Sequence, residues 1–305
     1  MLTRKQTWAL LALTLMWGVN WPMMKLSLQE LTPLYFRAIT MTLGAAWLFV
    51  YFKAKGFRMW PQSASQWRTI VWLGLPNILG WHTLSIMGVQ ELASGRAAIL
   101  GFAMPIYTVL LGAWLFGQPL NKRVSVAVLC VALTIGLLLW HELQQMSGRP
   151  SGVLWMEGAA LCWALGTLLM RRATFTLAPE VLTVWMLLLA SACIWVLAIA
   201  IEPVPSPGQF SVPMWASLVY GFVFNYGYAQ IIWFGMARNL PPAISAMSIM
   251  AVPLVGTLSA TLIVGEWPHW QDYAALIFGM AAIAAVLLPS RNNGGSSVTN
   301  STSTT

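Results

Sequence analysis

The chain carries one apolar pattern twice, first over residues 7–141 and then over residues 151–289. Landmarks of the first copy return 146 to 148 positions later, and this small drift needs only two single-residue insertions. Each copy contains five apolar segments. Because five is odd, a copy that crosses a membrane ends on the opposite side, and the second copy must lie in the inverted orientation. The matched landmarks are Trp17 and Trp163, Lys25 and Arg171, Pro33 and Pro179, Gly88 and Gly235, Pro105 and Pro253, and Gly117 and Gly265.

The apolar segments have the length of membrane-spanning helices, which need about 20 residues to cross a hydrocarbon core of about 30 Å. The chain is 58% hydrophobic and 8% charged, whereas a soluble domain is roughly 25% charged. We therefore predict an all-α membrane protein with ten transmembrane helices, arranged as two inverted-topology five-helix repeats. The predicted spans are 7–27, 33–52, 68–89, 94–116, 124–140, 151–170, 180–201, 212–234, 242–264 and 270–288.

This pattern divides the chain into three parts. Residues 7–141 form the first repeat of five helices, and residues 151–289 form the second. Residues 290–305 are rich in Asn, Gly, Ser and Thr, and such a composition buries too little apolar surface to fold. We therefore predict a disordered tail at 290–305.

The net charge of +8 is a signal of membrane topology. Loops rich in Lys and Arg stay in the cytoplasm, so we predict an inner-membrane, multi-pass protein with both termini cytoplasmic. The lipid bilayer is the expected partner of the basic residues, and no nucleic acid is expected. Twelve of the sixteen basic residues fall on one side of the spans: Arg4, Lys5, Lys53, Lys55, Arg58, Arg68, Lys122, Arg123, Arg171, Arg172, Arg238 and Arg291. The other side carries Glu30, Glu91, Glu142, Glu202, Glu266 and Asp272.

The sequence lacks the motifs of enzymes and of ATP-driven pumps. No phosphate-binding loop, dinucleotide-binding loop, zinc-protease motif or Ser-His-Asp signature occurs in it. Cys130, Cys162 and Cys193 lie inside predicted spans without metal-ligand spacing, and we interpret them as packing residues. We therefore predict that the protein is not an enzyme and has no cofactor and no metal site.

Short motifs occur in both halves in a fixed order and spacing. They are Trp17-Gly18-Val19-Asn20-Trp21-Pro22 with Lys25, Pro33 with Arg37, Ala97-Ala98-Ile99-Leu100 with Pro105, Leu115-Phe116-Gly117, Ala251-Val252-Pro253 and Gly265-Glu266. Over residues 7–289 this pattern resembles the EamA-type branch of the drug/metabolite transporter superfamily. Within that branch the sequence is most similar in character to the amino-acid and metabolite exporters. One departure is Gln118, where the family often has Glu, as the second copy does at Glu266.

Inverted repeats are the architecture of secondary transporters, whose substrate site lies near the middle of the membrane between the halves. The resemblance adds that the family exports small metabolites, often amino acids or amphipathic compounds. We therefore predict export of a small amphipathic molecule, such as an amino acid, by alternating access, with coupling to protons or to exchange left open. The alternatives are an uncoupled facilitator or channel, and a carrier of phosphorylated or nucleotide-type substrates. The second alternative calls for several inward-facing Lys or Arg at mid-depth.

The first span presents one wall of the expected substrate site. Trp17, Asn20 and Trp21 are three and four positions apart and therefore share one side of the helix. Both Trp residues lie inside the span, away from the interface where Trp usually anchors a helix, so we expect them to line a cavity. Trp163, the repeat mate of Trp17, is expected across the pseudo-two-fold axis. For Asn20, a hydrogen bond between helices is the competing interpretation.

The third and eighth spans supply the facing walls. Asn77 and Trp81 share a face of the third span beside His82, and Asn225 and Tyr228 lie at the equivalent depth of the eighth. Polar and aromatic groups at mid-depth on repeat-related helices are expected to line one cavity. His82 is the best titratable candidate for coupling, and the simpler interpretation is a hydrogen-bonded packing residue.

Arg96 is the most informative single charge. It lies in the first turn of the fourth span, where the helix dipole disfavours a cation. We expect it to pair with an anion. This anion is either Glu91 or a carboxylate of the substrate, which the planar guanidinium donors of Arg96 would bind. A side chain that reaches the outer interface is the third interpretation. Arg37 is similarly placed in the second span, and we interpret it as structural.

The predicted orientation can be tested by cysteine labelling. A cysteine introduced near Arg149 should react with a membrane-impermeant maleimide added outside the cell, because this residue lies on the acidic, outer side of the spans. A cysteine introduced near Arg58 should react only after the membrane is permeabilised. The reverse pattern would contradict cytoplasmic termini and the direction of transport inferred from them.

Overall fold

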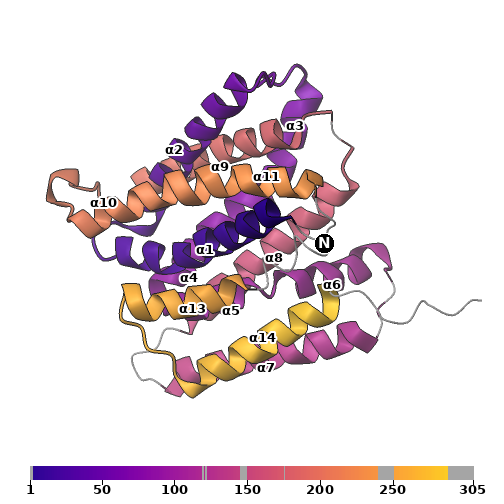
Figure 1. Ribbon diagram of the computed structural model, residues 1–305, viewed down its shortest axis with the longest axis vertical. Helices are drawn as coiled ribbons and strands as arrows, with labels where there is room; N and C mark the ends of the chain where they lie inside the picture. Colours follow the sequence, from indigo (N-terminus) through magenta and orange to yellow (C-terminus); the bar gives the residue numbers. More distant parts are fainter. Residues whose placement is uncertain are drawn as a thin grey trace, which may run out of the picture.

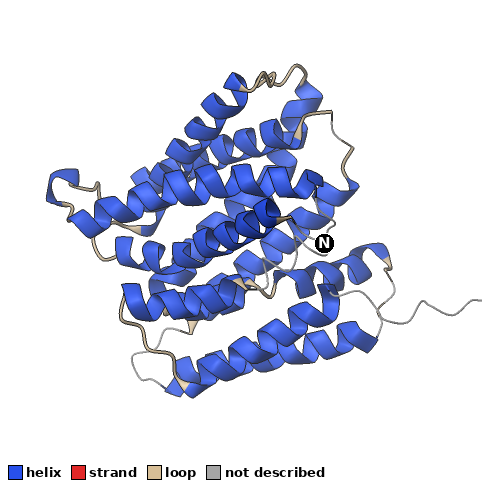
Figure 2. Cartoon of the chain, viewed as in Figure 1, coloured by secondary structure: helices blue, strands red, loops and turns tan. Residues whose placement is uncertain are grey.

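The computed structural model describes residues 3–118, 120, 122–144, 150–174, 176–239 and 251–287, and within these residues it contains helices and no strand. Figure 2 shows the helices joined by short loops. Six helical stretches in this part of the chain are long and apolar enough to cross a membrane. The all-α, multi-pass part of the prediction is thus confirmed. The count of ten spans stays a prediction, since the ninth (242–264) begins outside the described residues and the tail at 290–305 also lies outside them.

The first half contains five helical stretches, two of which are composite. The third stretch joins α3, a π-helical turn η1 and α4, and the fourth is broken between α5 and α6. The elements are α1 (Arg4–Ser27), α2 (Pro33–Ala54), α3 (Ala64–Gly74), η1 (Leu75–Gly80), α4 (Trp81–Glu91), α5 (Ser94–Gly101), α6 (Met104–Phe116) and α7 (Lys122–Gln144).

The second half has the same order of elements where it is described. Its third stretch again contains a π-helical segment, η3, between two α-helices. The elements are α8 (Ser151–Arg172), α9 (Pro179–Ile201), the short 3-10 turn η2 (Pro207–Gln209), α10 (Val212–Val219), η3 (Tyr220–Tyr228), α11 (Ala229–Asn239), α13 (Val252–Ile263) and α14 (Trp270–Leu287).

Local backbone features also recur at repeat-related positions. Pro105 and Pro253 each occupy the first turn of a helix, α6 and α13, where proline's missing N–H costs nothing. Gly117 and Gly265 each follow the end of such a helix in the left-handed conformation, with φ of 64° and 72°, which favours glycine. The sequence repeat therefore has a counterpart in the backbone.

Helices of the two halves are interleaved. α2 packs along α9, and α7 packs along α14, so that two pairs of repeat mates lie side by side (Figure 1). α4 packs on α8 and α1 packs on α13, which again joins one half to the other. Nearly every helix thus buries part of its surface against the opposite half, and the core is shared by both.

Glutamates that follow the end of one helix cap the start of another. The first N–H groups of a helix have no partner within it and carry partial positive charge. Glu202, just after α9, accepts hydrogen bonds from the backbone N–H groups of Leu34 and Tyr35 at 3.0 and 3.1 Å, at the start of α2. Glu266, just after α13, accepts from the N–H of Ser94 at 2.7 Å, at the start of α5.

The same arrangement occurs in the other two cross-half pairs. Glu30, just after α1, accepts from the Ser211 N–H at 2.8 Å at the start of α10, and the hydroxyl and N–H of Ser211 lower the pKa of Glu30. Glu91, the last residue of α4, accepts from the hydroxyl of Ser151, the first residue of α8. The carboxylates of the acidic side therefore join the C-terminal end of one helix to the N-terminal end of an antiparallel neighbour.

Glycines bring α2 and η3 into direct contact. A Cβ added at Gly44 would lie 2.2 Å from the Cβ of Tyr226, and one added at Gly221 would lie 2.7 Å from Cγ2 of Thr40. Small residues allow this close approach between membrane helices. The contact holds Tyr226 in the interior, where it is 2% exposed.

Replacing Gly44 should therefore destabilise the protein. We expect Gly44→Ala to force α2 and η3 apart, at a cost of about 1–3 kcal/mol, and to lower the temperature of thermal unfolding in detergent by several degrees. Gly136→Ala is the matched control, since Gly136 is also within a helix and a Cβ there meets no atom within 4 Å. Equal unfolding temperatures for the two variants would contradict the close packing of α2 on η3.

Candidate functional site

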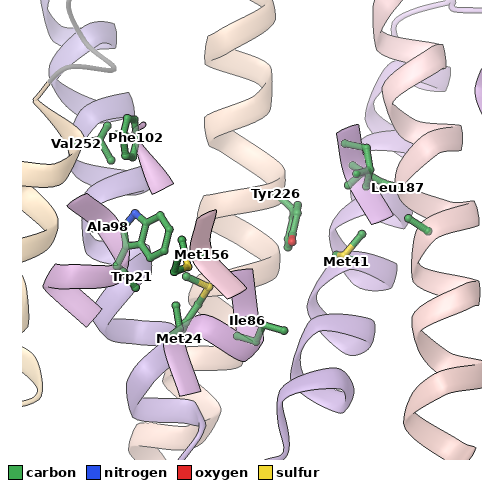
Figure 3. Close-up of a cluster of buried hydrophobic side chains, with 14 of the residues drawn as sticks. Trp21, Met24, Met41, Ile86, Ala98, Phe102, Met156, Leu187, Tyr226 and Val252 are labelled. Atoms are coloured by element: carbon green, nitrogen blue, oxygen red, sulfur yellow. The ribbon is translucent and has the colours of Figure 1, made fainter. Parts of the chain in front are cut away.

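Three tryptophans from both halves meet in the interior. The ring of Trp81 on α4 lies 6.5 Å from that of Trp21 on α1 and 5.2 Å from that of Trp163 on α8, in edge-to-face arrangements. Trp21 is 5% exposed, and Figure 3 shows it grouped with Met24 and Met156. The structure thus brings together three of the aromatic residues predicted to line the site, in one aromatic cluster of Trp21, Trp81 and Trp163.

The break in the fourth stretch lies against this aromatic cluster. α5 ends at Gly101, and α6 begins at Met104. A Cβ at Gly101 would lie 3.1 Å from the ring of Trp21 and 3.2 Å from that of Trp81, so the absence of a side chain lets the chain pass close to both rings. Discontinuous helices of this kind form the substrate sites of many secondary transporters, because their free backbone groups face the cavity.

Trp17 does not join the aromatic cluster. It is half-buried, and its ring lies 5.5 Å from that of Trp233 on α11. Among the described residues, no ring contact links Trp17 to its repeat mate Trp163. Trp163 lies in the aromatic cluster and Trp17 lies outside it, and the expectation that both line one substrate site stays a prediction.

The three predicted asparagines are all buried but have different surroundings. Asn77 donates to the sulfur of Met170 at 2.9 Å and packs against Gly166 on α8, which is a contact between helices. Asn20 and Asn225 are each 8% exposed. Neither side chain has a hydrogen-bond partner among the residues that the structure describes. A role of Asn20 and Asn225 in the substrate site stays a prediction.

Tyr228 is more exposed than the other residues predicted to line the site. It is 46% exposed and lies beside Trp47 at 5.9 Å on the outer surface of the bundle. The residue that points inward is Tyr226, because η3 is π-helical and its wider turn changes which positions share a face. Tyr226 is therefore the buried tyrosine of η3, and a role of Tyr228 in the site stays a prediction.

The sequence shows the family directly. The model of the EamA-like transporter family matches residues 5–140 and 150–288. The chain belongs to the EamA-like transporter family. This confirms the resemblance noted from the motifs, and it makes the chain a membrane transporter of the drug/metabolite type.

Similar proteins are found in several bacteria. Over 247 residues the chain is 21% identical to "Uncharacterized transporter YoaV" of Bacillus subtilis (strain 168), covering 81% of this chain and 84% of that protein. It is 21% identical over 291 residues to "Probable amino-acid metabolite efflux pump" of Salmonella typhimurium (strain LT2), covering 92% and 94%. It is 22% identical over 285 residues to "Uncharacterized inner membrane transporter YedA" of Escherichia coli (strain K12), covering 92% and 89%.

A solved crystal structure has the same fold. It superposes with a TM-score of 0.65 at 22% sequence identity and covers 93% of this chain and 96% of its own. At this identity the match concerns the fold alone. The arrangement of helices described above is therefore one that a known protein adopts.

In this EamA transporter Arg96 is neutralised by the protein itself. Its Nε donates to Asp272 Oδ1 at 2.7 Å, and its Nη1 donates to Glu142 Oε1 at 2.5 Å. Its Nη2 lies 2.8 Å from Nε2 of His141, whose ring stacks near His269. Arg96, Asp272 and Glu142 are at most 8% exposed.

The expected partners of Arg96 need correction. Glu91 contacts Ser151 and is not the anion that Arg96 answers to. Asp272 lies 176 positions away in the sequence, on α14, and Glu142 is on α7. With two carboxylates in place, Arg96 ties α5 to α7 and α14, and a third carboxylate from a substrate has little to gain there. The missed signal was that Asp272, Glu142 and Arg96 lie at similar depth on the acidic side.

His82 has a different setting. It is 9% exposed on α4, and its Nδ1 lies 3.2 Å from the hydroxyl of Tyr226 on η3. The same hydroxyl accepts a hydrogen bond from Nη1 of Arg37 at 3.0 Å. His82 is thus joined to the opposite half through one tyrosine, and Arg37 belongs to the same group.

Glu157 is another acid within the spans. Glu157 on α8 accepts a hydrogen bond from the hydroxyl of Tyr107 on α6, and its second oxygen is buried without a partner in the described part of the chain. A small hollow between α5, α7 and α14 borders this carboxylate. An ionisable group inside a membrane bundle is a candidate for coupling, so Glu157 stands beside His82 in that role.

The Arg96 network can be tested through stability. Arg96→Met would leave Asp272 and Glu142 buried without a counter-charge, which should cost about 3–5 kcal/mol and lower the unfolding temperature. Adding Asp272→Asn and Glu142→Gln to that variant removes both anions and should restore most of the loss. If Arg96→Met unfolds like the wild type, the network does not hold the helices together. Glu91→Gln serves as the control, because Glu91 is outside this network.

Proposed function

We propose that this chain is an inner-membrane secondary transporter that exports small amphipathic metabolites, with amino acids and related compounds as the substrate class. The proposal also places both termini in the cytoplasm, in keeping with the basic residues of one side. A relative named for amino-acid metabolite efflux and another named as an inner membrane transporter support it. Membership of the family supports the transport activity, and the residues of the site support the proposed class of substrate.

The observation that carries the proposal is the aromatic cluster of Trp21, Trp81 and Trp163. Its rings come from α1, α4 and α8, which belong to both halves, and they lie against the break at Gly101. Aromatic faces bind the apolar part of a ligand, and a few polar groups orient it. The buried amides of Asn20 and Asn225 supply such polar groups.

Alternating access follows from the way in which the halves share this site. Substrate held between α1, α4 and α8 would contact both halves at once, so that rocking of one half against the other exposes it to either side. The break between α5 and α6, with Pro105 in the first turn of α6, is a natural place for such bending.

The two alternatives fit less well. An uncoupled channel needs a continuous water-filled path, whereas Trp21, Asn77 and His82 are packed in the interior. A carrier of phosphorylated substrates needs several free cations at mid-depth, and Arg96 is already occupied by Asp272 and Glu142. The transporter could be coupled either to protons or to exchange. His82 and Glu157 are the titratable groups that could couple it to protons.

The proposal is tested by counterflow in proteoliposomes. Vesicles loaded with one unlabelled amino acid should accumulate the labelled form transiently, as carriers do and open pores do not. Trp81→Ala removes the central ring of the aromatic cluster and should reduce initial uptake about tenfold or more, since aromatic contacts and buried area are lost together. Trp114→Ala is the matched control, because Trp114 is 80% exposed on α6.

Three outcomes would contradict it. Absence of counterflow for all twenty amino acids would remove amino acids as the substrate class. Uptake without counterflow would favour a channel. Equal activities of the Trp81→Ala and Trp114→Ala variants would show that the aromatic cluster is not the site.

A further inference from the structure

Arg37 is a buried cation with only neutral partners. It lies on α2 and is 2% exposed. Its Nη1 donates to the Tyr226 hydroxyl at 3.0 Å, and its Nη2 donates to the Met24 sulfur at 3.1 Å and to the Ser85 hydroxyl at 3.4 Å. Its Nε is buried without a hydrogen-bond partner among the described residues. The two bonds of Nη2 are weak, because the acceptor in Met24 is a thioether sulfur and the bond to Ser85 is long.

No carboxylate of the chain compensates this charge. All eight Asp and Glu residues lie in the part of the chain that the structure describes. Ion pairs with N···O distances of at most 4.0 Å among these residues involve Arg96 and not Arg37. Glu202, which lies at the start of the same helix, is engaged by the N–H groups of Leu34 and Tyr35. The two buried arginines of the spans therefore differ, because Arg96 has its anions built in and Arg37 has none.

An isolated buried cation is unfavourable. Arginine stays protonated in proteins, and a charge removed from water without a counter-charge costs several kcal/mol even after relaxation. An anion bound at Arg37 would remove that penalty. Its unpartnered Nε–H and the adjacent Nη2 form the edge of the guanidinium that holds a carboxylate with two parallel hydrogen bonds.

The position of Arg37 suits the proposed substrate. Met24, which it contacts, is one turn of α1 beyond Trp21, or roughly 5 Å along the helix. An amino acid whose carboxylate meets Arg37 could therefore lay its side chain on Trp21 and Trp81. In Figure 3 Tyr226 lies between the group of Trp21, Met24 and Met156 and the group around Met41.

We propose that Arg37 is the anion-recognition residue of the transport site and binds the carboxylate of the substrate through its Nε and Nη2 groups. This inference rests on the proposed function for the identity of the substrate, and the role of Arg37 itself rests on its contacts. The Tyr226 hydroxyl, which lies between Arg37 and His82, joins the recognition site to the opposite half. A carboxylate bound to Nε and Nη2 would take the place of the weak contacts that Nη2 makes with Met24 and Ser85 and would leave the Nη1 contact to Tyr226 in place.

The test measures ligand-induced thermal stabilisation of the full chain in lipid nanodiscs. The probes are the twenty L-amino acids, butyrate and benzoate, each beside its carboxamide, and sodium chloride. We expect at least one carboxylate to stabilise the wild type and its amide to bind about tenfold more weakly or worse, because the charge-assisted pair is lost. Arg37→Met should abolish this preference, and Arg37→Lys should keep part of it because the charge remains.

Two further readouts separate recognition from structure. Substrate-free Arg37→Met should unfold at the wild-type temperature or above, because it removes an uncompensated charge, whereas a structural arginine would behave as Arg96 does. Arg68→Met is the matched control, since Arg68 is an exposed arginine on α3. It should bind every probe as the wild type does.

The outcomes divide without overlap. The inference is overturned if no carboxylate stabilises the wild type, or if Arg37→Met keeps the preference for acid over amide. It is also overturned if chloride saturates the wild type and no carboxylate displaces it, since Arg37 then holds a resident ion. Counterflow of an amino acid, together with unchanged binding of carboxylates by the Arg37→Met variant, would contradict the role of Arg37 and leave the proposed function in place. Binding of benzoate or butyrate through Arg37 without amino-acid transport would sink the amino-acid substrate class alone.

Discussion

The backbone N–H and C=O groups at the ends of a helix need hydrogen-bond partners, and the packing of this protein depends on the side chains that provide them. Four glutamates at or just after the ends of α1, α4, α9 and α13 bind the starts of α10, α8, α2 and α5. Glu30, Glu202 and Glu266 accept from backbone N–H groups at the positive end of a helix dipole, and Glu91 accepts from the hydroxyl of Ser151. On the same side Lys25 donates to the carbonyls of Val89, Gln90 and Leu92 at 2.8–2.9 Å, at the end of α4. These contacts fix which antiparallel helices are neighbours and therefore join the two halves.

Within that frame the interior treats its two buried arginines in opposite ways. Arg96 is enclosed by Asp272, Glu142 and His141 and acts as a fastener between α5, α7 and α14. Arg37 is enclosed by neutral groups and sits among α1, α2, α4 and η3. A buried arginine that is paired with carboxylates of the protein stabilises the arrangement of helices that contains the pair. A buried arginine without such a partner favours any arrangement in which an anion can bind to it. Arg96 therefore stabilises the packing of the helices, whereas Arg37 is the residue that we propose recognises the substrate.

Much of the candidate site could be predicted from the sequence, and the failures have specific causes. Trp21, Trp81 and Trp163 meet as expected, because their depth along the spans is a local property of the sequence. Tyr226 is buried and Tyr228 is exposed on the π-helical segment η3, and no residue pattern in the sequence indicates a π-helix there. The partners of Arg96 could not be chosen from the sequence, because Asp272 is 176 residues away. Arg37 was interpreted as structural because its lack of a counter-ion is visible only when all its neighbours are known.

The sequence by itself determined the all-helical membrane class, the twofold repeat and the family, since hydropathy, segment length and motif spacing are properties of short stretches of chain. The tertiary structure alone decided which charges are satisfied and which tyrosine of η3 reaches the interior. Those outcomes depend on helix contacts such as Gly44 on Tyr226, where an approach of a few ångströms decides what each side chain can touch. Hydrogen bonds and ion pairs act over such short distances that segment patterns cannot specify them.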